Sequence, residues 1–318
     1  MAEIGLRTLS AGDPTAAGGR ATVRRDFSGA SMKKVAIGIA AIAALIGTRA
    51  VAADMAVKAP PPPEPVTAPF GWAGFYIGAN GGYGWKDPTV IFSPNDVESQ
   101  FSTCGGGNGG TCAPPASFSI DGGFGGFQGG YNWQFNQQWV AGIESDFDWS
   151  GIKGAGTSNF ILGSNTGPTP SNFAVSQSIE WFGTVRARLG YLAADNLLLF
   201  ASGGLAYGRV KESVSLNSQP GANHEFAPFG YGCVAGANCF VGGNATTELG
   251  WAAGSGIEYA LSSNVSVRAE YLYVSLGRSA VDVVAQSPFT QPNAASFTAA
   301  FSRAAINTVR GGVNWRFN

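Results

Sequence analysis

Charged residues spaced two apart are the residues of this sequence that could take part in acid–base catalysis or in ion pairing. Glu144, Asp146 and Asp148 follow this spacing, and Arg186 and Arg188 repeat it. Two carboxylates can act as general acid and general base when their environments drive their pKa values apart. Carboxylates beside arginines more often form structural ion pairs. Because side chains two apart share one face of a β-strand, the spacing predicts strands with a charged face.

Eleven charged side chains fall on this face of the predicted strands. In a small barrel, opposite charges would meet across the interior and pair, so we expect them to plug it. A narrow water-filled conduit is the alternative, because a channel also needs a polar interior. The predicted interior charges are Glu144, Asp146, Asp148, Glu180, Arg186, Arg188, Glu258, Arg268, Glu270, Arg310 and Arg316.

Catalytic residues are hard to assemble from this sequence. A Ser-His-Asp hydrolase would have to use His224, the single histidine, and no G-x-S-x-G segment accompanies it. The glycine-rich segment 122–130 lies within a strand pattern and no helix pattern follows it, so it does not match a nucleotide-binding fingerprint. We therefore expect a protein that is not an enzyme and that has no cofactor and no metal site.

The four cysteines form two pairs that are close in the sequence, Cys104 with Cys112 and Cys233 with Cys239. Each pair lies in a predicted outward loop of a secreted chain, which favours two disulfides that pin the loop tips. Three pairings are available to four cysteines. A zinc site and free thiols are the alternatives, but the cysteine spacings do not match the usual zinc patterns.

Period-two alternation of apolar and polar side chains recurs along most of the chain. In the segment 265–277, Val267 and Tyr271 lie on one face of the predicted strand. Arg268 and Glu270 lie on the other face. We expect eight such strands, each long enough to cross a bilayer at the tilt that a barrel imposes. Their predicted ranges are 72–85, 118–135, 139–150, 175–192, 197–211, 245–261, 265–277 and 299–317.

The fold class that follows is all-β, a transmembrane antiparallel up-and-down β-barrel. Short turns on one side and long loops on the other are typical of such barrels, with the short side periplasmic. A hairpin hidden in 212–244 would raise the strand number to ten. A soluble sandwich or lipocalin-like barrel is the alternative, but the charged faces fit a lumen better than a soluble core. The predicted tight turns are 136–138, 193–196 and 262–264, and the long loops are 86–117, 151–174, 212–244 and 278–298.

The composition suits a membrane barrel better than a soluble domain. Charged residues make up 12% of the chain, against about 25% in ordinary soluble domains. Hydrophobic residues make up 45% but are dispersed rather than gathered into membrane-spanning helices. Tyr and Trp gather near predicted strand ends, as they do in the aromatic girdles at membrane interfaces. The predicted girdle residues are Trp72, Trp85, Tyr131, Trp133, Trp139, Trp149, Trp315 and Phe317.

The N-terminal part of the chain is expected to lie outside the barrel. Residues 1–31 are polar and patternless, which indicates a start codon assigned too early. The segment 32–53 has two lysines, a short apolar run and small residues at its end, so it is predicted to be a secretory signal peptide; an N-terminal membrane anchor is the alternative. The proline-rich segment 54–70 is predicted to be an extended periplasmic leader. The barrel would then occupy 71–318.

Two segments resemble one known family. WAGFYIGANGGYGW at 72–85 and INTVRGGVNWRF at 306–317 are similar to the alphaproteobacterial outer-membrane surface-antigen and porin-like barrels of the opacity type. The resemblance covers most of the chain after the signal. It implies an eight-stranded barrel that the assembly machinery inserts into the bacterial outer membrane. The family typically ends on an aromatic residue that this machinery reads; Trp315 and Phe317 supply the aromatic face here, but Asn318 follows them.

Three functions remain open from the sequence. The resemblance implies a structural, surface-exposed barrel that supports envelope integrity, and the interior charges predict that it is mostly plugged. A small porin-like diffusion channel and a loop-mediated ligand or host binder are the alternatives. Expected partners are outer-membrane lipid, the barrel assembly machinery and periplasmic chaperones during biogenesis, and peptidoglycan or envelope contacts through the leader. After residue 53 the chain has 12 Lys and Arg against 17 Asp and Glu, which does not indicate nucleic-acid binding.

Overall fold

The computed structural model describes residues 70–96, 112–164, 167–218, 224–226, 231–233, 238–286 and 296–317. The predicted start extension and signal peptide, nearly all of the leader, Cys104 and Asn318 lie outside the described residues. Within the described part of the chain, no helix is long and apolar enough to cross a membrane.

Fourteen β-strands make up the described structure. Twelve of them belong to one sheet, and the other two form a separate hairpin. Their bounds are β1 (Gly74–Lys86), β2 (Thr89–Pro94), β3 (Ala116–Ser117), β4 (Ile120–Phe135), β5 (Trp139–Ser164), β6 (Gly167–Ala194), β7 (Leu197–Ser218), β8 (His224–Phe226), β9 (Tyr231–Cys233), β10 (Asn238–Ala260), β11 (Val265–Ser275), β12 (Ala280–Ala285), β13 (Ser296–Phe301) and β14 (Ala305–Arg316).

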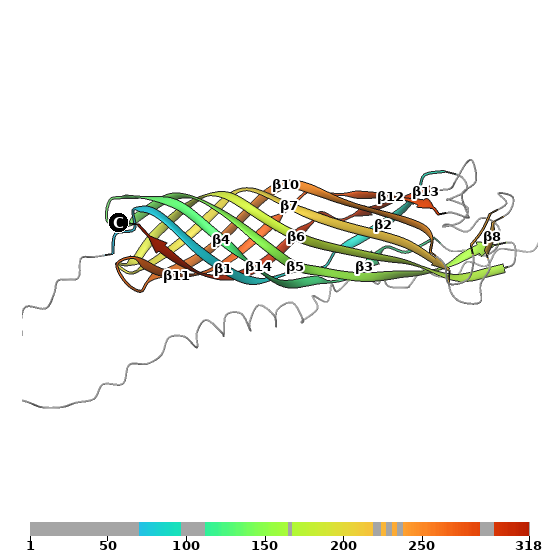
Figure 1. Cartoon of the computed structure of the whole chain (residues 1–318), viewed down its shortest axis with the longest axis horizontal. Helices are drawn as coiled ribbons and strands as arrows, with labels where there is room; N and C mark the ends of the chain where they lie inside the picture. The colour runs from blue at the N-terminus through green and yellow to red at the C-terminus, as the bar shows by residue number, and fades with distance from the viewer. Residues whose placement is uncertain are drawn as a thin grey trace, which may run out of the picture. The chain divides into compact units, whose positions relative to one another are not determined.

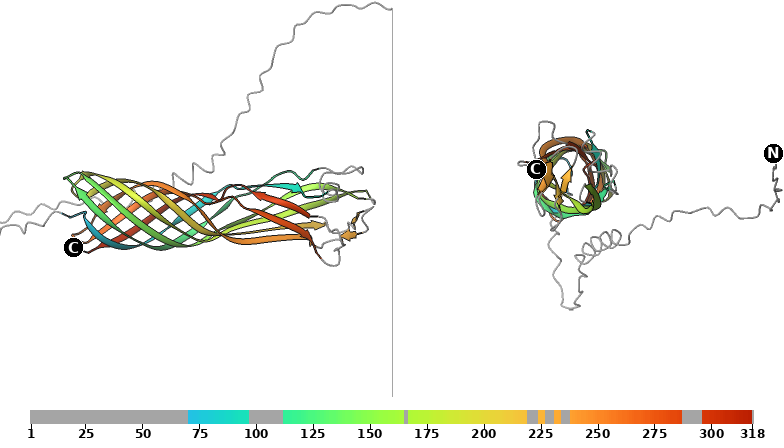
Figure 2. Two further views of the ribbon diagram at one scale, coloured as in Figure 1. Left: turned by 90° about the horizontal axis from the view of Figure 1, so that it is seen from above. Right: turned by 90° about the vertical axis from the view of Figure 1, so that its right-hand side faces the viewer.

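Eight strands close into a barrel, which Figure 1 shows from the side and the right-hand view of Figure 2 shows end-on. In order round the ring they are β1, β4, β5, β6, β7, β10, β11 and β14, and β14 pairs with β1 to close it. All neighbours in the ring are antiparallel. The predicted eight-stranded, up-and-down barrel is therefore confirmed. The hairpin of β8 and β9 lies within 212–244 but forms its own sheet, so it does not enlarge the ring.

The register of the ring fixes the tilt of its strands. The cross-strand path from Phe75 in β1 passes through Tyr131, Ile143, Ala187, Gly203, Ala253, Tyr273 and Asn307, and Asn307 pairs with Trp85. The path therefore returns to β1 ten residues beyond its start. Such a stagger requires strongly tilted strands, and eight of them enclose an interior that side chains can fill.

A belt of outward apolar side chains surrounds the end of the barrel that contains the tight turns. We call this part the membrane section; it comprises β1, β4, β11 and β14 with the adjoining halves of β5, β6, β7 and β10. Aromatic pairs mark both edges of the belt, with Trp139 against Tyr191 near the turns and Trp251 against Tyr273 at the other edge. The belt includes Phe75, Ile77, Phe127, Ile143, Val185, Leu189, Leu199, Leu205, Leu249, Ile257 and Val313.

The rest of the barrel, which we call the upper section, has the opposite polarity. It comprises β2, β3, β12 and β13 with the remaining halves of β5, β6, β7 and β10. Outward positions such as Asn159, Ser213 and Asp282 are polar and exposed. Soluble barrels bury apolar residues in this way, so the upper section is suited to water above the bilayer. Its apolar interior includes Val90, Phe160, Phe173, Val175, Val214, Leu216, Phe240, Val281, Val283, Phe297 and Ala299.

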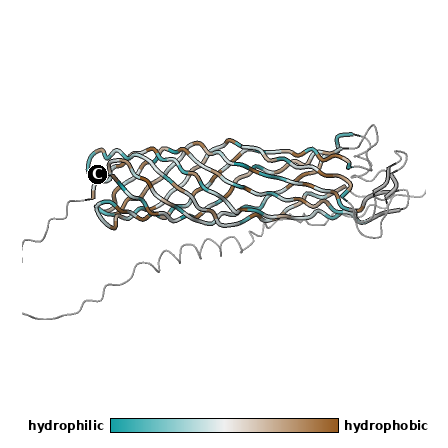
Figure 3. Tube along the Cα trace, in the orientation of Figure 1, coloured by the Kyte–Doolittle hydropathy of each residue, from teal (hydrophilic) through white to brown (hydrophobic). Residues whose placement is uncertain are grey.

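The upper section corrects the predicted long loops. β5 continues to Ser164 and β6 begins at Gly167, where the sequence predicted a loop over 151–174. β2, β12 and β13 likewise occupy parts of the loops predicted beside β1, β11 and β14. Apolar and polar residues still alternate along these segments (Figure 3). The prediction failed because it required apolar residues to face outward, whereas here they face inward.

A close approach of two strands requires glycine at position 126. A Cβ atom there would overlap the Phe147 carbonyl oxygen and lie 2.6 Å from the Asp148 carboxylate. We predict that Gly126→Ala lowers the free energy of unfolding by about 1–3 kcal/mol, because overpacking forces the backbone to shift. Gly123→Ala is the matched control on the same strand, since its Cβ would meet its nearest atom at 3.8 Å. Urea titrations in detergent that gave both variants equal stability would contradict this packing argument.

Candidate functional site

The lumen of the membrane section contains ten of the eleven predicted interior charges, all of them buried. Because side chains alternate along each strand, these charged side chains point into the lumen. There they meet side chains from strands on the opposite side of the barrel. Five are carboxylates and five are guanidinium groups, so the set is balanced in charge. They are Glu144, Asp146 and Asp148 from β5, Arg186 and Arg188 from β6, Glu258 from β10, Arg268 and Glu270 from β11, and Arg310 and Arg316 from β14.

Arg186 lies at the centre of this network. Its Nη2 atom is 2.5 Å from Glu144 Oε1 and 3.0 Å from Asp146 Oδ2, and its Nη1 atom is 2.5 Å from Glu270 Oε1. Its Nη1 also donates to the Ser202 hydroxyl, and its Nε donates to the Thr184 hydroxyl. One guanidinium group therefore links β6 to β5, β7 and β11 across the lumen.

On the periplasmic side of Arg186, arginines and carboxylates continue to alternate. Arg268 Nη1 is 2.9 Å from Glu144 Oε2, and the Tyr76 hydroxyl donates to the same oxygen at 2.8 Å. Arg188 Nη2 is 2.8 Å from Glu258 Oε2. Both carboxylates thus receive hydrogen bonds from charged donors, which are among the stronger hydrogen bonds in proteins.

On the outer side, Arg310 continues the network. Its Nε donates to Glu270 Oε2 at 2.6 Å, and its Nη2 donates to Asp146 Oδ2 at 3.0 Å. Its Nη1 lies 3.6 Å from Asp148 Oδ2. The charged layer therefore runs without interruption from Glu258 to Asp148.

Glu180 is the predicted interior charge that the structure places elsewhere. Its side chain is 43% exposed on the outer surface, and Arg209 Nε lies 3.1 Å from its Oε2 atom. The cross-strand register of β6 shifts between Ile179 and Trp181. This β-bulge inserts one residue, so the alternation changes phase and Glu180 turns outward.

An apolar floor closes the periplasmic mouth below the charges. Trp72 is fully buried there, and its indole Nε1 donates to the Asp195 carbonyl at 3.0 Å. It packs in a cluster with Val140 and Leu198. The prediction that Trp72 belongs to an interface girdle was therefore wrong, because the chain enters the barrel mouth before β1 begins. Arg316 lies over the Trp72 ring, 5.1 Å from its centroid.

A small polar layer interrupts the apolar interior outward of the charges, near the start of the upper section. Gln177 Nε2 donates to Glu212 Oε1 at 2.6 Å, and the Ser279 hydroxyl donates to Glu212 Oε2 at 2.5 Å. Lys86 Nζ donates to the Ser302 carbonyl at 3.3 Å. The lumen thus contains, from the periplasm outward, an apolar floor, the charged layer, an apolar layer that includes Phe182, Leu272 and Ile306, this polar layer and the apolar upper core.

Several lumen residues escaped the sequence analysis because they are uncharged. Asn80, Gln128 and Asn314 are buried inward, and Gln128 Nε2 donates to Asn314 Oδ1 at 2.6 Å. The Phe200 ring lies against two guanidinium groups, with its centroid 4.3 Å from Arg188 Cζ and 4.9 Å from Arg268 Cζ. The period-two pattern could have found them, since each lies on the inward face of its strand.

The arrangement favours structural pairing over chemistry. The carboxylates of Glu144, Asp146 and Glu270 each contact more than one basic or hydroxyl group. This leaves them little freedom to transfer a proton to a substrate. Among the described residues, no group of three or more His, Cys, Asp or Glu side chains is placed to hold a metal ion.

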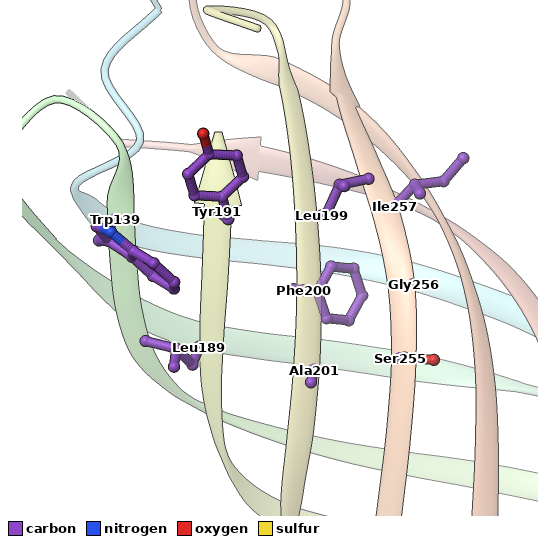
Figure 4. Close-up of a pocket in the computed structure, with 9 residues that line it drawn as sticks. All are labelled: Trp139, Leu189, Tyr191, Leu199, Phe200, Ala201, Ser255, Gly256 and Ile257. Atoms are coloured by element: carbon purple, nitrogen blue, oxygen red, sulfur yellow. The ribbon is translucent and has the colours of Figure 1, made fainter. Parts of the chain in front are cut away.

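A shallow groove of about 500 Å³ lies on the wall of the barrel (Figure 4). Trp139, Leu189, Tyr191 and Ile257 border it, and Ala201 lies between them. These side chains face outward within the apolar belt. The groove therefore opens to hydrocarbon, and it is separate from the lumen.

The predicted disulfides are not tested by the described residues. Cys112 and Cys239 are described, and Cys239 is buried in the upper core. Cys104 and the side chain of Cys233 lie outside the described residues, so both pairings stay predictions.

The fold and the charged lumen agree with a match to a known protein family. The family model of the outer membrane protein beta-barrel domain matches residues 50–317. This chain belongs to that family. The membrane section with its lipid-facing belt is accordingly the transmembrane part of an outer membrane protein beta-barrel, and the protein is located in the bacterial outer membrane.

The chain is similar to two curated relatives and to one solved structure. The chain is 36% identical over 290 residues to the 31 kDa outer-membrane immunogenic protein of Brucella melitensis biotype 1, covering 88% of this chain and 98% of that protein. It is 31% identical over 185 residues to the 22 kDa outer membrane protein of Rhizobium leguminosarum bv. viciae, covering 58% and 64%. The crystal structure of the outer membrane protein OprG from Pseudomonas aeruginosa aligns with a TM-score of 0.35 and 12% identity, over 77% of this chain and 97% of that chain.

Proposed function

We propose that this protein is a structural outer-membrane barrel that supports envelope integrity and surface exposure and whose lumen is closed to solutes. The observation that carries the proposal is the buried network around Arg186, which joins β5, β6, β7 and β11 through hydrogen bonds and ion pairs. An eight-stranded barrel has room for interior side chains but for little else. In this proposal the carboxylates and arginines are structural, and the protein catalyses no reaction.

Two further layers support a closed lumen. The floor of Trp72, Val140 and Leu198 and the upper apolar core lie on either side of the charged layer. A diffusion channel would need continuous water through both, and apolar constrictions of this kind exclude water and ions. The name of the Brucella melitensis relative, an outer-membrane immunogenic protein, supports surface exposure of this chain.

We predict that the folded barrel gives no stable conductance steps in planar bilayers bathed in concentrated KCl. Insertion is checked on the same membranes by heat-modifiable migration, since a folded barrel runs differently on a detergent gel until it is boiled. A channel-forming porin in parallel chambers is the positive control. Reproducible ion steps from the inserted protein would replace this proposal with a small porin-like diffusion channel.

A further inference from the structure

The basic side chains on the outer surface of the barrel share a distinctive placement. The structure describes eleven Lys and Arg residues, of which six are buried inside the barrel and five face outward. We call the outward five the basic collar. The collar consists of Lys153, Arg209, Lys211, Arg278 and Arg303.

The strand register places two collar residues in one cross-strand row. Lys153 on β5 pairs with Ser178 on β6, and Ser178 pairs with Lys211 on β7. Lys153 and Lys211 therefore lie in one cross-strand row, two strands apart.

The polar layer inside the barrel brings Arg278 and Arg303 to a height similar to that of Lys211. Glu212, which follows Lys211, accepts a hydrogen bond from Ser279, which follows Arg278. Arg303 follows Ser302, whose carbonyl accepts from Lys86 in the same layer. The backbone joins the last two collar positions, because Leu276 N donates to Ala304 O and Ala304 N donates to Gly277 O. The collar therefore encircles much of the barrel at the height of the polar layer.

This level coincides with one edge of the membrane. Trp149 precedes Lys153 on β5, and Tyr207 precedes Lys211 on β7, and both aromatic residues belong to the outer edge of the apolar belt. Aromatic girdles lie at the boundary between hydrocarbon and headgroups. The collar, a few residues further outward, therefore lies at the headgroups of the outer leaflet.

Basic residues occur on the barrel wall at this level alone, as far as the structure describes the chain. At the periplasmic end, the charged residue on the described outer surface is the acidic Asp195, and the upper section beyond the collar presents no described Lys or Arg outward. Acidic residues lie at this level too: Asp121 on β4 is the cross-strand partner of Lys153, and Glu180 pairs with Arg209. The other four collar residues form no ion pair with a described residue, so their charges are available to an external anion.

We infer that the basic collar binds the phosphate groups of phosphorylated glycolipids, the lipopolysaccharide class, in the outer leaflet. Guanidinium and ammonium groups are the usual protein ligands of phosphate. An asymmetric bilayer with phosphorylated glycolipid on one side explains why basic residues ring one edge of the belt. The inference does not depend on whether the lumen conducts.

The test uses the full folded barrel in neutral detergent with EDTA present, so that divalent cations do not bridge acidic residues to phosphate. Binding of fluorescently labelled lipopolysaccharide is measured for the parent and for a variant with Lys153→Gln, Lys211→Gln, Arg278→Gln and Arg303→Gln. We expect affinity to fall about fivefold for each removed charge and roughly several hundredfold for all four. Removal of the phosphate groups from the glycolipid should weaken binding to the parent to the same degree.

Controls separate this outcome from loss of folding or general charge effects. Lys153→Arg with Lys211→Arg keeps both charges and should keep the affinity. Glu248→Gln with Asp282→Asn removes one half-buried and one exposed acidic charge and should not weaken binding. Heat-modifiable migration verifies that each variant is folded. The measurement with phosphate-free glycolipid uses the parent protein, so it does not depend on the folding of any variant. Unchanged affinity of the folded Gln variant, unchanged affinity for phosphate-free glycolipid, or equal binding of phosphatidylglycerol would overturn the inference.

Discussion

Replacement of Arg186 with alanine is expected to lower the free energy of unfolding by about 3–5 kcal/mol, the usual cost of removing one partner from a buried ion pair. The substitution leaves three carboxylates, those of Glu144, Asp146 and Glu270, without their shared guanidinium group. The interior offers them no water in exchange if the lumen is closed. Urea titration of the folded barrel in detergent or lipid, followed by heat-modifiable migration, measures the effect.

Arg209→Ala is the matched control, because Arg209 pairs with a single carboxylate on the exposed surface. Exposed ion pairs contribute about 0–1 kcal/mol, so this variant should remain close to the parent. Equal loss of stability in both variants would show that arginine removal acts through something other than buried pairing. A near-parental Arg186 variant would mean that solvent reaches the network and would count against the closed lumen.

Replacement of Phe173 with alanine is expected to lower the free energy of unfolding by about 3–5 kcal/mol, the usual range for a buried aromatic residue. Phe173 is fully buried in the upper section. Its ring stacks on Phe92 and Phe160 at centroid distances of 4.2 and 5.1 Å, and it meets Phe297 edge-on at 4.7 Å. We expect faster proteolysis of the upper section, while the membrane section keeps its heat-modifiable migration.

Ile91→Ala is the control for this experiment, since Ile91 lies on β2 in the same section but is 55% exposed. Substitutions at such surface positions usually change stability by less than about 0.5 kcal/mol. If Phe173→Ala left both stability and protease resistance unchanged, the upper section would not hold the packed apolar core described above. The two predictions together test the two interiors of the barrel separately.

The two interiors have different physical origins. In the membrane section the outside must be apolar, so charged residues can be accommodated only inward, where they pair. In the upper section the outside meets water, so apolar residues move inward and pack. The outer surface of the barrel therefore changes from apolar to polar along its length, near the level where Gln177 and Ser279 donate to Glu212. The collar residues lie on the outside of this transition.

Most of the predictions that the structure confirms rest on the alternation of apolar and polar side chains along the strands. It placed Glu144, Asp146, Arg186 and Glu270 on one face, and this needs only the two-residue period of a strand. Together with alternating connection lengths it predicted the number and order of the ring strands. Trp315 and Phe317 both face outward, while their recognition by the assembly machinery stays a prediction.

The sequence by itself determined the barrel and its charged interior, because period two is a local property of the backbone that any long strand displays. The tertiary structure decided what depends on register and on the surrounding medium. A one-residue bulge turned Glu180 outward, the entry of the chain into the mouth buried Trp72, and water above the bilayer reversed the polarity of the upper strands. It also decided which charges meet, since the ten-residue stagger of the ring sets which strands face each other across the lumen.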